Sequence, residues 1–258
     1  DIDSAEINKN VRADCALVGN VKDILTRIIP LVQKKDESEW NVQVNGWKNH
    51  LPSMYAKKTK LHPKFAFEYM HDKIGDKAII TTEVGQHQMW TSLFYPFSVP
   101  RSFLTSGGLG TMGYGTGAAI GARLGNPDKI VVHIAGDGSF RMNCNELATI
   151  SHYGLPIIII IFNNGALGNV RQWQTLFYEK RYSATTLDFA PDFVKLADAY
   201  GVAGVRVTSE AEFKKAFDAA LASGKPAVID AAIDKDEMVL PMIPPGKSVD
   251  RIMMDIDL

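Results

Sequence analysis

The stretch from Ile130 to Asn164 reads IVVHIAGDGSFRMNCNELATISHYGLPIIIIIFNN, and it decides the fold. It contains two runs rich in β-branched residues, 130–135 and 157–162, which are typical of parallel strands buried on both faces. Residues 141–153 lie between the runs and predict one helix packed on one face, because three apolar residues recur at helical spacing: Met142, Leu147 and Ile150. The β-α-β order predicts two neighbouring parallel strands in an α/β domain.

Each run ends abruptly in side chains that carry oxygen. Asp137 follows the first run, and Asn164 follows the second. A right-handed crossover brings both strand ends to one edge of the sheet, in the crevice where open α/β sheets bind ligands. Carboxylate and carboxamide oxygens suit Mg²⁺, which readily takes further ligands from phosphates. The pair predicts a metal-diphosphate site. Two polar loops on an ordinary sheet are the alternative, and the polar ending of the second run favours the site.

The loop after the first run suits a phosphate group. Gly136 and Gly138 let the backbone approach a ligand closely, and the N–H groups of Gly138 and Ser139 open the next helix toward an anion. The loop has no lysine, so it is not a Walker loop. A metal ion would have to neutralise the phosphate charge instead.

Composition sets broad limits on the class of protein. The 258 residues suffice for one large domain with extra segments, and 46% hydrophobic and 22% charged residues are ordinary for a globular protein. A net charge of −1 gives no reason to expect nucleic acid or an anionic membrane as partner, and no apolar run approaches a membrane span. Cys15 and Cys144 form neither a metal-ligand spacing nor a disulfide framework, which favours a reduced, cytoplasmic location of bacterial type; a processed organellar chain is the alternative.

A glycine-rich stretch raises a different possibility. Gly108, Gly110 and Gly113 satisfy the Gly-x-Gly-x-x-Gly pattern of dinucleotide-binding folds, so a nicotinamide-dependent oxidoreductase has to be weighed. Asp137 could then be the ribose ligand. However, Asp137 is followed at once by glycine and serine, and the next strand repeats the polar ending. Both features favour the metal-diphosphate site over the dinucleotide site.

Several motifs resemble those of known enzymes. Gly136-Asp-Gly138, the 24 residues 139–162, and then Asn163-Asn164 resemble the signature of thiamine-diphosphate enzymes. Four further stretches resemble the large subunit of acetolactate (acetohydroxyacid) synthases, and the match runs along nearly the whole chain: Val84–Trp90, Ser106–Gly115, Gln172-Trp173 and Val239–Ser248.

The resemblance implies a fold and an activity. The fold is a three-layer α/β domain with a mostly parallel six-stranded sheet and helices on both faces. The activity is the condensation of two pyruvates, or of pyruvate with 2-oxobutyrate, with loss of CO₂ in branched-chain amino-acid biosynthesis. Thiamine diphosphate and Mg²⁺ are the implied cofactors, with FAD possible in the intact enzyme. The implied partners are further copies of the chain, as a dimer or tetramer, and a regulatory small subunit. Another thiamine-diphosphate decarboxylase or carboligase is the alternative.

The resemblance also assigns roles to residues. The implied metal ligands are Asp137, Asn164 and the carbonyl oxygen of Ala166. Met112 is implied to be a wedge under the cofactor, and Trp173 is implied to shape the pocket for the second 2-oxo acid. The implied cofactor contacts are Gly85, Gln86, His87, Gly110, Met112, Gly136, Gly138, Ser139, Asn164, Leu167 and Gly168.

The residues alone leave other interpretations open. His87 could be a loop histidine hydrogen-bonded to backbone, and Met112 and Trp173 could be ordinary packing residues. The synthases usually have methionine where this chain has Asn169 or its neighbour, in a region that lines the substrate cavity. The Gly-Asp-Val turn near their flavin reads Gly19-Asn20-Val21 here, without the acid.

Four segments are expected along the chain. Residues 1–35, with a short strand at Cys15–Val18 and a helix over Val21–Leu31, resemble the end of a middle, nucleotide-type domain. Residues 36–60 predict a helical connector, 61–235 the diphosphate-binding domain, and 236–258 a tail over the active site. The glutamate that activates the cofactor in the family lies in another domain. We therefore expect a C-terminal piece of a larger polypeptide that holds half an active site and is inactive alone. A non-catalytic binding or assembly module is the alternative.

Overall fold

The computed structural model describes residues 1–50, 61–189 and 191–254, with the side chains of residues 49 and 50 left aside. The chain forms two compact units, Asp1–Tyr55 and Ala56–Leu258. Every strand found among the described residues lies in the larger unit.

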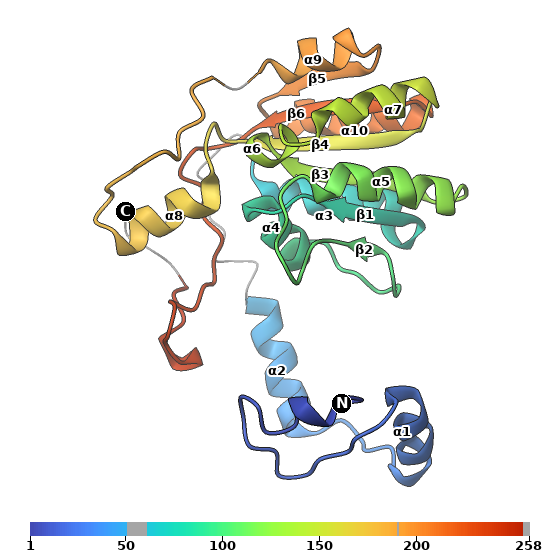
Figure 1. Ribbon diagram of the computed structural model, residues 1–258, viewed down its shortest axis with the longest axis vertical. Coiled ribbons are helices and arrows are strands. Elements are labelled where there is room, and N and C mark those ends of the chain that lie inside the picture. Colours follow the sequence, from blue (N-terminus) through green and yellow to red (C-terminus); the bar gives the residue numbers. More distant parts are fainter. Residues whose placement is uncertain (51–60, 190, 255–258) are drawn as a thin grey trace. The chain divides into compact units, whose positions relative to one another are not determined.

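A six-stranded sheet forms the middle of the larger unit (Figure 1). All neighbouring strands run parallel, in the order β2-β1-β3-β4-β6-β5. In that order the strands are Phe103–Leu104, Ala78–Thr82, Ile130–Gly136, Ile157–Asn163, Ala227–Ala232 and Ala203–Val207. The expected α/β fold with a parallel six-stranded sheet is confirmed.

The two central strands are β3 and β4, which come from the two β-branched runs. Nearly every residue of both strands is buried, because helices cover both faces of the sheet. Their register sets Gly136 opposite Phe162. The residues that follow each strand therefore begin side by side at one edge of the sheet.

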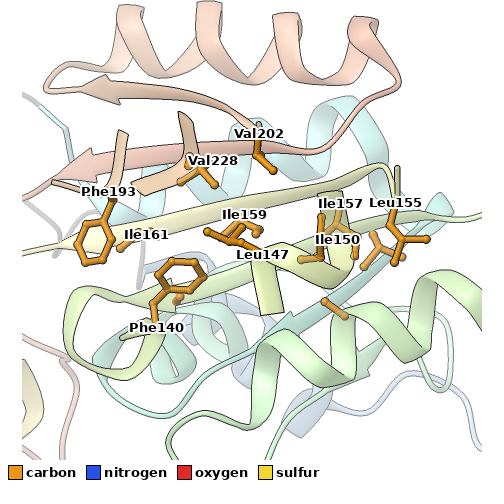
Figure 2. Packing of buried hydrophobic residues seen from close by; sticks show 14 of the residues in the cluster. Phe140, Leu147, Ile150, Leu155, Ile157, Ile159, Ile161, Phe193, Val202 and Val228 are labelled. Carbon is orange, nitrogen blue, oxygen red and sulfur yellow. The ribbon is translucent and has the colours of Figure 1, made fainter. Parts of the chain in front are cut away.

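One face of the sheet packs against α5 (Tyr114–Gly125), α6 (Asp137–Phe140), α7 (Leu147–His152) and α9 (Phe193–Ala199). Figure 2 shows the alternate residues Ile157, Ile159 and Ile161 of β4 pointing into this layer with Phe140 and Leu147. All five side chains are fully buried, and burying each contributes on the order of 1.5–3 kcal/mol. This cluster holds the strand ends of the site on a rigid support.

The opposite face packs against α3 (Pro63–Ile74), α4 (Gln86–Phe94) and α10 (Glu210–Ser223). Phe162 of β4 contacts Phe67 and Trp90, with ring centroids 5.4 Å and 6.2 Å apart. Tyr69 of α3 donates a 2.7 Å hydrogen bond to Asp218 of α10. Helices thus cover both faces, as expected for a three-layer domain.

The predicted single helix over 141–153 is wrong. The strand runs directly into the short helix α6, and a 3₁₀ turn at Cys144–Glu146 precedes α7. Asn143, with φ −142° and ψ 25°, leaves the helical conformation between them. Met142 is consequently 58% exposed, whereas Leu147 and Ile150 are buried as predicted.

The α-helices found among the described residues of the smaller unit are α1 (Val21–Ile28) and α2 (Glu39–His50), and the side chain of Asn20 caps the first. A 3₁₀ turn at Ile29–Leu31 follows α1 directly, so that the two together span the helix predicted over Val21–Leu31. The strand predicted at Cys15–Val18 is wrong, since the described residues of this unit offer no strand for it to pair with. Part of the predicted connector, 51–60, lies outside the described residues, and the four-segment division stays a prediction.

Candidate functional site

A pocket opens at the carboxyl ends of β1, β3 and β4. Most of the residues singled out from the sequence line it: Gly85, Gln86, His87, Met112, Gly136, Asp137, Gly138, Ser139, Asn164, Ala166, Leu167 and Gly168. Gly110 and Trp173 do not. The sequence did not single out the apolar wall of the pocket, which is formed by Val84, Trp90, Phe162 and Val170.

Asp137 and Asn164 lie at the ends of the neighbouring strands β3 and β4, as predicted. Asp137 is 1% exposed, and its Oδ2 has no hydrogen-bond partner among the described residues. Burial raises the pKa of this carboxyl to about 6, although hydrogen bonding from the backbone of Asp137 and Asn164 opposes the shift. A buried carboxylate oxygen without a partner is costly, and a bound cation would remove that cost.

The donors around Asp137 fit a hard metal ion. Among the described residues, no cluster of three or more histidine, cysteine, aspartate or glutamate side chains could hold a metal. Ligands beyond Asp137 would therefore come from amide and carbonyl oxygens, such as those of Asn164 and Ala166, and from a phosphate. Oxygen-only sets of this kind suit Mg²⁺. The residues present thus fit a metal-diphosphate group.

The two asparagines at the end of β4 act differently. Asn163 turns to the neighbouring strand, where its Nδ2 donates a 2.9 Å hydrogen bond to the buried carboxylate of Asp230. Asn164 lines the pocket, and its Oδ1 accepts a 3.2 Å hydrogen bond from the N–H of Ala166. Only the second asparagine can therefore contact a ligand.

The backbone approaches the pocket closely at two glycines. A Cβ atom on Gly136 would lie 2.8 Å from Nδ1 of His87. A Cβ atom on Gly168 would collide with the carboxamide of Gln86. Glycine is therefore needed at both positions for the lining side chains to keep their places.

His87 lies in the first turn of α4, so its predicted place in a loop is wrong, but its ring does share a hydrogen bond with the backbone of Glu83, as the packing alternative expected. It is 5% exposed, and within the part of the chain that the structure describes its Nε2 has no hydrogen-bond partner. Burial, together with the neighbouring His133, lowers the pKa of His87 to about 3. The ring is therefore neutral at pH 7, with one ring nitrogen left for a ligand.

The glycine-rich stretch leads into α5 through left-handed residues, with φ +66° at Gly110 and +88° at Gly113. The buried carboxylate of Glu83 accepts hydrogen bonds from the N–H groups of Gly113 (2.5 Å) and Gly115 (3.0 Å). A side chain of the protein already occupies this helix start, so it is not open to a dinucleotide phosphate. Sequence reasoning missed this role of Glu83, because 30 residues separate it from Gly113.

Trp173 lies in α8 (Gly168–Phe177) and lines a second pocket with Tyr178 and Arg181. This pocket shares Asn169 and Val170 with the first one. Trp173 is 40% exposed, so it is not a core residue. Its role toward a substrate stays a prediction.

Comparison with known proteins identifies the class. Residues 83–231 match the family "Thiamine pyrophosphate enzyme, C-terminal TPP binding domain", and the chain belongs to this family. Thiamine pyrophosphate is thiamine diphosphate, so the family matches the cofactor expected from the sequence. The matched segment contains all the predicted site residues.

The chain is also similar to acetolactate synthase large subunits. It is 44% identical to a probable acetolactate synthase large subunit of Methanocaldococcus jannaschii over 99% of this chain and 45% of the relative. It is 42% identical to the large subunit of Corynebacterium glutamicum over 100% of this chain and 43% of the relative. The chain thus spans less than half the length of these relatives. Among the described residues, no helix is long and apolar enough to cross a membrane.

Proposed function

We propose that this chain is the thiamine-diphosphate- and Mg²⁺-binding part of an acetolactate synthase. The complete enzyme would join two pyruvates, or pyruvate and 2-oxobutyrate, with loss of CO₂, in branched-chain amino-acid biosynthesis. The observation that carries the proposal is the Oδ2 of buried Asp137, which no described residue hydrogen-bonds, beside Asn164 in a pocket lined by the matched family segment. When bound, the cofactor supplies the electron sink for decarboxylation and carbon–carbon bond formation.

The protein side chains would bind and orient the cofactor. Asp137, Asn164 and the carbonyl of Ala166 would hold the metal, and the backbone of Gly136, Gly138 and Ser139 would face the diphosphate.

A second group of lining residues would complete the contacts with the cofactor. Gln86 and neutral His87 would donate or accept hydrogen bonds at the diphosphate, and Leu167 and Gly168 would pack beside it. Met112 would support the cofactor from below, while the carbonyl of Gly110 would accept from its amino group.

The rest of the active site would come from elsewhere. A glutamate from another domain, usually that of a second subunit in the family, would activate the cofactor, so this chain alone would be inactive. The complete enzyme would be a homo-oligomer in the cytoplasm, with a regulatory small subunit as a further partner. FAD would belong to that complete enzyme. A nicotinamide-dependent activity has less support, because Glu83 fills the helix start that a dinucleotide would need.

Calorimetry tests the proposal on the full chain. Thiamine diphosphate should bind only with Mg²⁺ present, and Asp137→Ala or Asn164→Ala should abolish that binding. Asp72→Ala, which removes an exposed carboxylate on α3, should leave it unchanged. Equal binding in all three variants, or binding of NADH in place of thiamine diphosphate, would refute the proposal.

A further inference from the structure

A line of buried side-chain amides connects Asn164 with the C-terminal segment of the larger unit. Asn164 Nδ2 donates to Gln86 Oε1 at 3.2 Å, and Gln86 Nε2 donates to Gln172 Oε1 at 2.9 Å. Gln172 then binds both backbone groups of Val239: its Nε2 donates to the carbonyl at 3.0 Å, and its Oε1 accepts from the N–H at 2.9 Å. Gln86 is 4% exposed, and Gln172 is 3% exposed.

The direction of each bond follows from the one before it. A backbone N–H can only donate and a carbonyl can only accept, so Val239 fixes which end of Gln172 is oxygen. That oxygen accepts from Gln86, whose Nε2 also donates to the carbonyl of Glu237 at 2.9 Å. The Oε1 of Gln86 must therefore face Asn164, and the Nδ2 of Asn164 must donate to it.

The last amide in the line belongs to the candidate site. With Nδ2 turned to Gln86, Asn164 has its Oδ1 on the other side of the group. The N–H of Ala166 donates to that Oδ1 and agrees with the same orientation. An asparagine turned the other way would present an NH₂ group, which cannot ligate a cation.

We propose that Gln172 and the segment 237–239 are positioning elements for the metal site, acting through Gln86 to hold Asn164 with its oxygen toward Mg²⁺. This rests on the proposed function, which places the metal at Asn164. The proposal explains why a glutamine is buried at position 172, where an apolar residue could fill the space without a hydrogen-bonding demand. It also gives the segment 237–239 a role in holding Gln86 and Gln172.

The test uses the full chain and titrates Mg²⁺ at fixed thiamine diphosphate by calorimetry. Gln172→Met keeps the length of the side chain but removes both hydrogen-bonding ends. Loss of a partner that orients a metal ligand costs roughly 10–100-fold in metal affinity, and we expect about tenfold here. Saturating Mg²⁺ should restore cofactor binding in this variant, because the defect lies in the orientation of one ligand.

Two further variants separate orientation from general damage. Gln172→Glu keeps an oxygen that accepts from Gln86 and Val239, and as the protonated acid, the form that burial favours, it still donates to the Val239 carbonyl. Its Mg²⁺ affinity should therefore stay within about threefold of the original. Gln88→Met makes the same exchange on α4, at a glutamine whose Nε2 binds Thr105 outside this line, and should leave the affinity unchanged. Equal Mg²⁺ affinity in Gln172→Met and the original chain would overturn the proposal.

A second measurement tests the hydrogen bonds between the amides directly, without metal or cofactor. Nitrogen-15 NMR of the side-chain amides should show slowly exchanging protons on Asn164, Gln86 and Gln172 in the original chain. Gln172→Met should speed exchange at Asn164 as well as at Gln86, and unchanged exchange at Asn164 would overturn the proposal. If the original chain binds no Mg²⁺ with thiamine diphosphate, the proposed function fails, and the NMR result still decides whether the amide line exists.

Discussion

Oε1 of Glu83 lies 3.7 Å from Nε2 of His133, and both side chains are fully buried. His133 sits in β3 with its ring nitrogens 3.0 Å from Thr81 Oγ1 and 3.4 Å from Thr116 Oγ1. Burial lowers the pKa of His133 to about 3 and raises the pKa of Glu83. Both shifts disfavour a charged pair, so the histidine is a neutral bridge between β1, β3 and α5.

The neutral His133 predicts a pH-dependent stability. Its folded-state pKa of about 3 lies below the unfolded value of 6.5, so only the unfolded chain gains a proton between those values. The free energy of unfolding should therefore fall as the pH falls from 6.5 toward 3, by up to about 1.4 kcal/mol per pH unit for this group. His87 contributes with the same sign. Asp137, whose pKa is raised to about 6, and Glu83, whose pKa is also raised, oppose both histidines in the acidic part of that window.

The substitution His133→Gln should remove one of these contributions. Urea unfolding at pH 7 and pH 5 should show a pH-induced loss of stability smaller by about 1–2 kcal/mol than in the original chain. Between pH 7 and 8 the two proteins should differ by a constant amount, because His133 is neutral in both states. A variant with the full pH-induced loss would show that His133 is not the group that titrates.

Gly168→Ala should destabilise the chain by about 1–3 kcal/mol, the usual cost of overfilling a packed site. The new methyl group would press on the carboxamide of Gln86, which its hydrogen bonds hold in place. Gly117→Ala is the matched control, since no described residue lies within 4 Å of its Cβ position in α5. That change should stabilise the helix by up to about 1 kcal/mol. Urea midpoints that moved together for the two variants would contradict the close approach at Gly168.

Trp173→Leu tests the substrate side of the proposal, in an enzyme that includes the remaining domains. The two candidate second substrates differ by one methylene, which a hydrophobic pocket discriminates by only about 1–3 kcal/mol. Loss of the flat ring should lower the preference for 2-oxobutyrate over pyruvate roughly tenfold, while cofactor affinity stays unchanged because the metal ligands are untouched. Competition between the two acids measures the ratio. An unchanged ratio would mean that the second pocket does not receive the substrate.

Sequence patterns predicted the parts of the fold that depend on neighbours in the chain. The strands β3 (Ile130–Gly136) and β4 (Ile157–Asn163) lie where the two runs of β-branched residues, 130–135 and 157–162, predicted them. Asp137 and Asn164 could be placed together because parallel strands end at one edge of the sheet. Met142 was wrongly predicted to pack on the buried face of a helix, since periodicity alone could not show that Asn143 breaks the helix.

Other parts of the site depend on partners far along the chain. Gln172 and Val239 are 67 residues apart, and no local pattern joins them. The bond between Glu83 and Gly113 likewise follows from packing, not from spacing. Residues so far apart in the chain come into contact only in the folded domain, once the strands have paired in their final order.

That strand order has a consequence for where the pocket lies. After β1 the chain turns to the face that carries α4, and after the adjacent β3 it turns to the opposite face, through α6 and α7. Two neighbouring strands whose connections leave in opposite directions form a topological switch point, and the diverging loops leave an opening between them. The opening comes from connectivity alone, so its position would survive replacement of the side chains that line it. Substitutions in the loops can therefore alter which ligand is held without moving the place where a ligand is held.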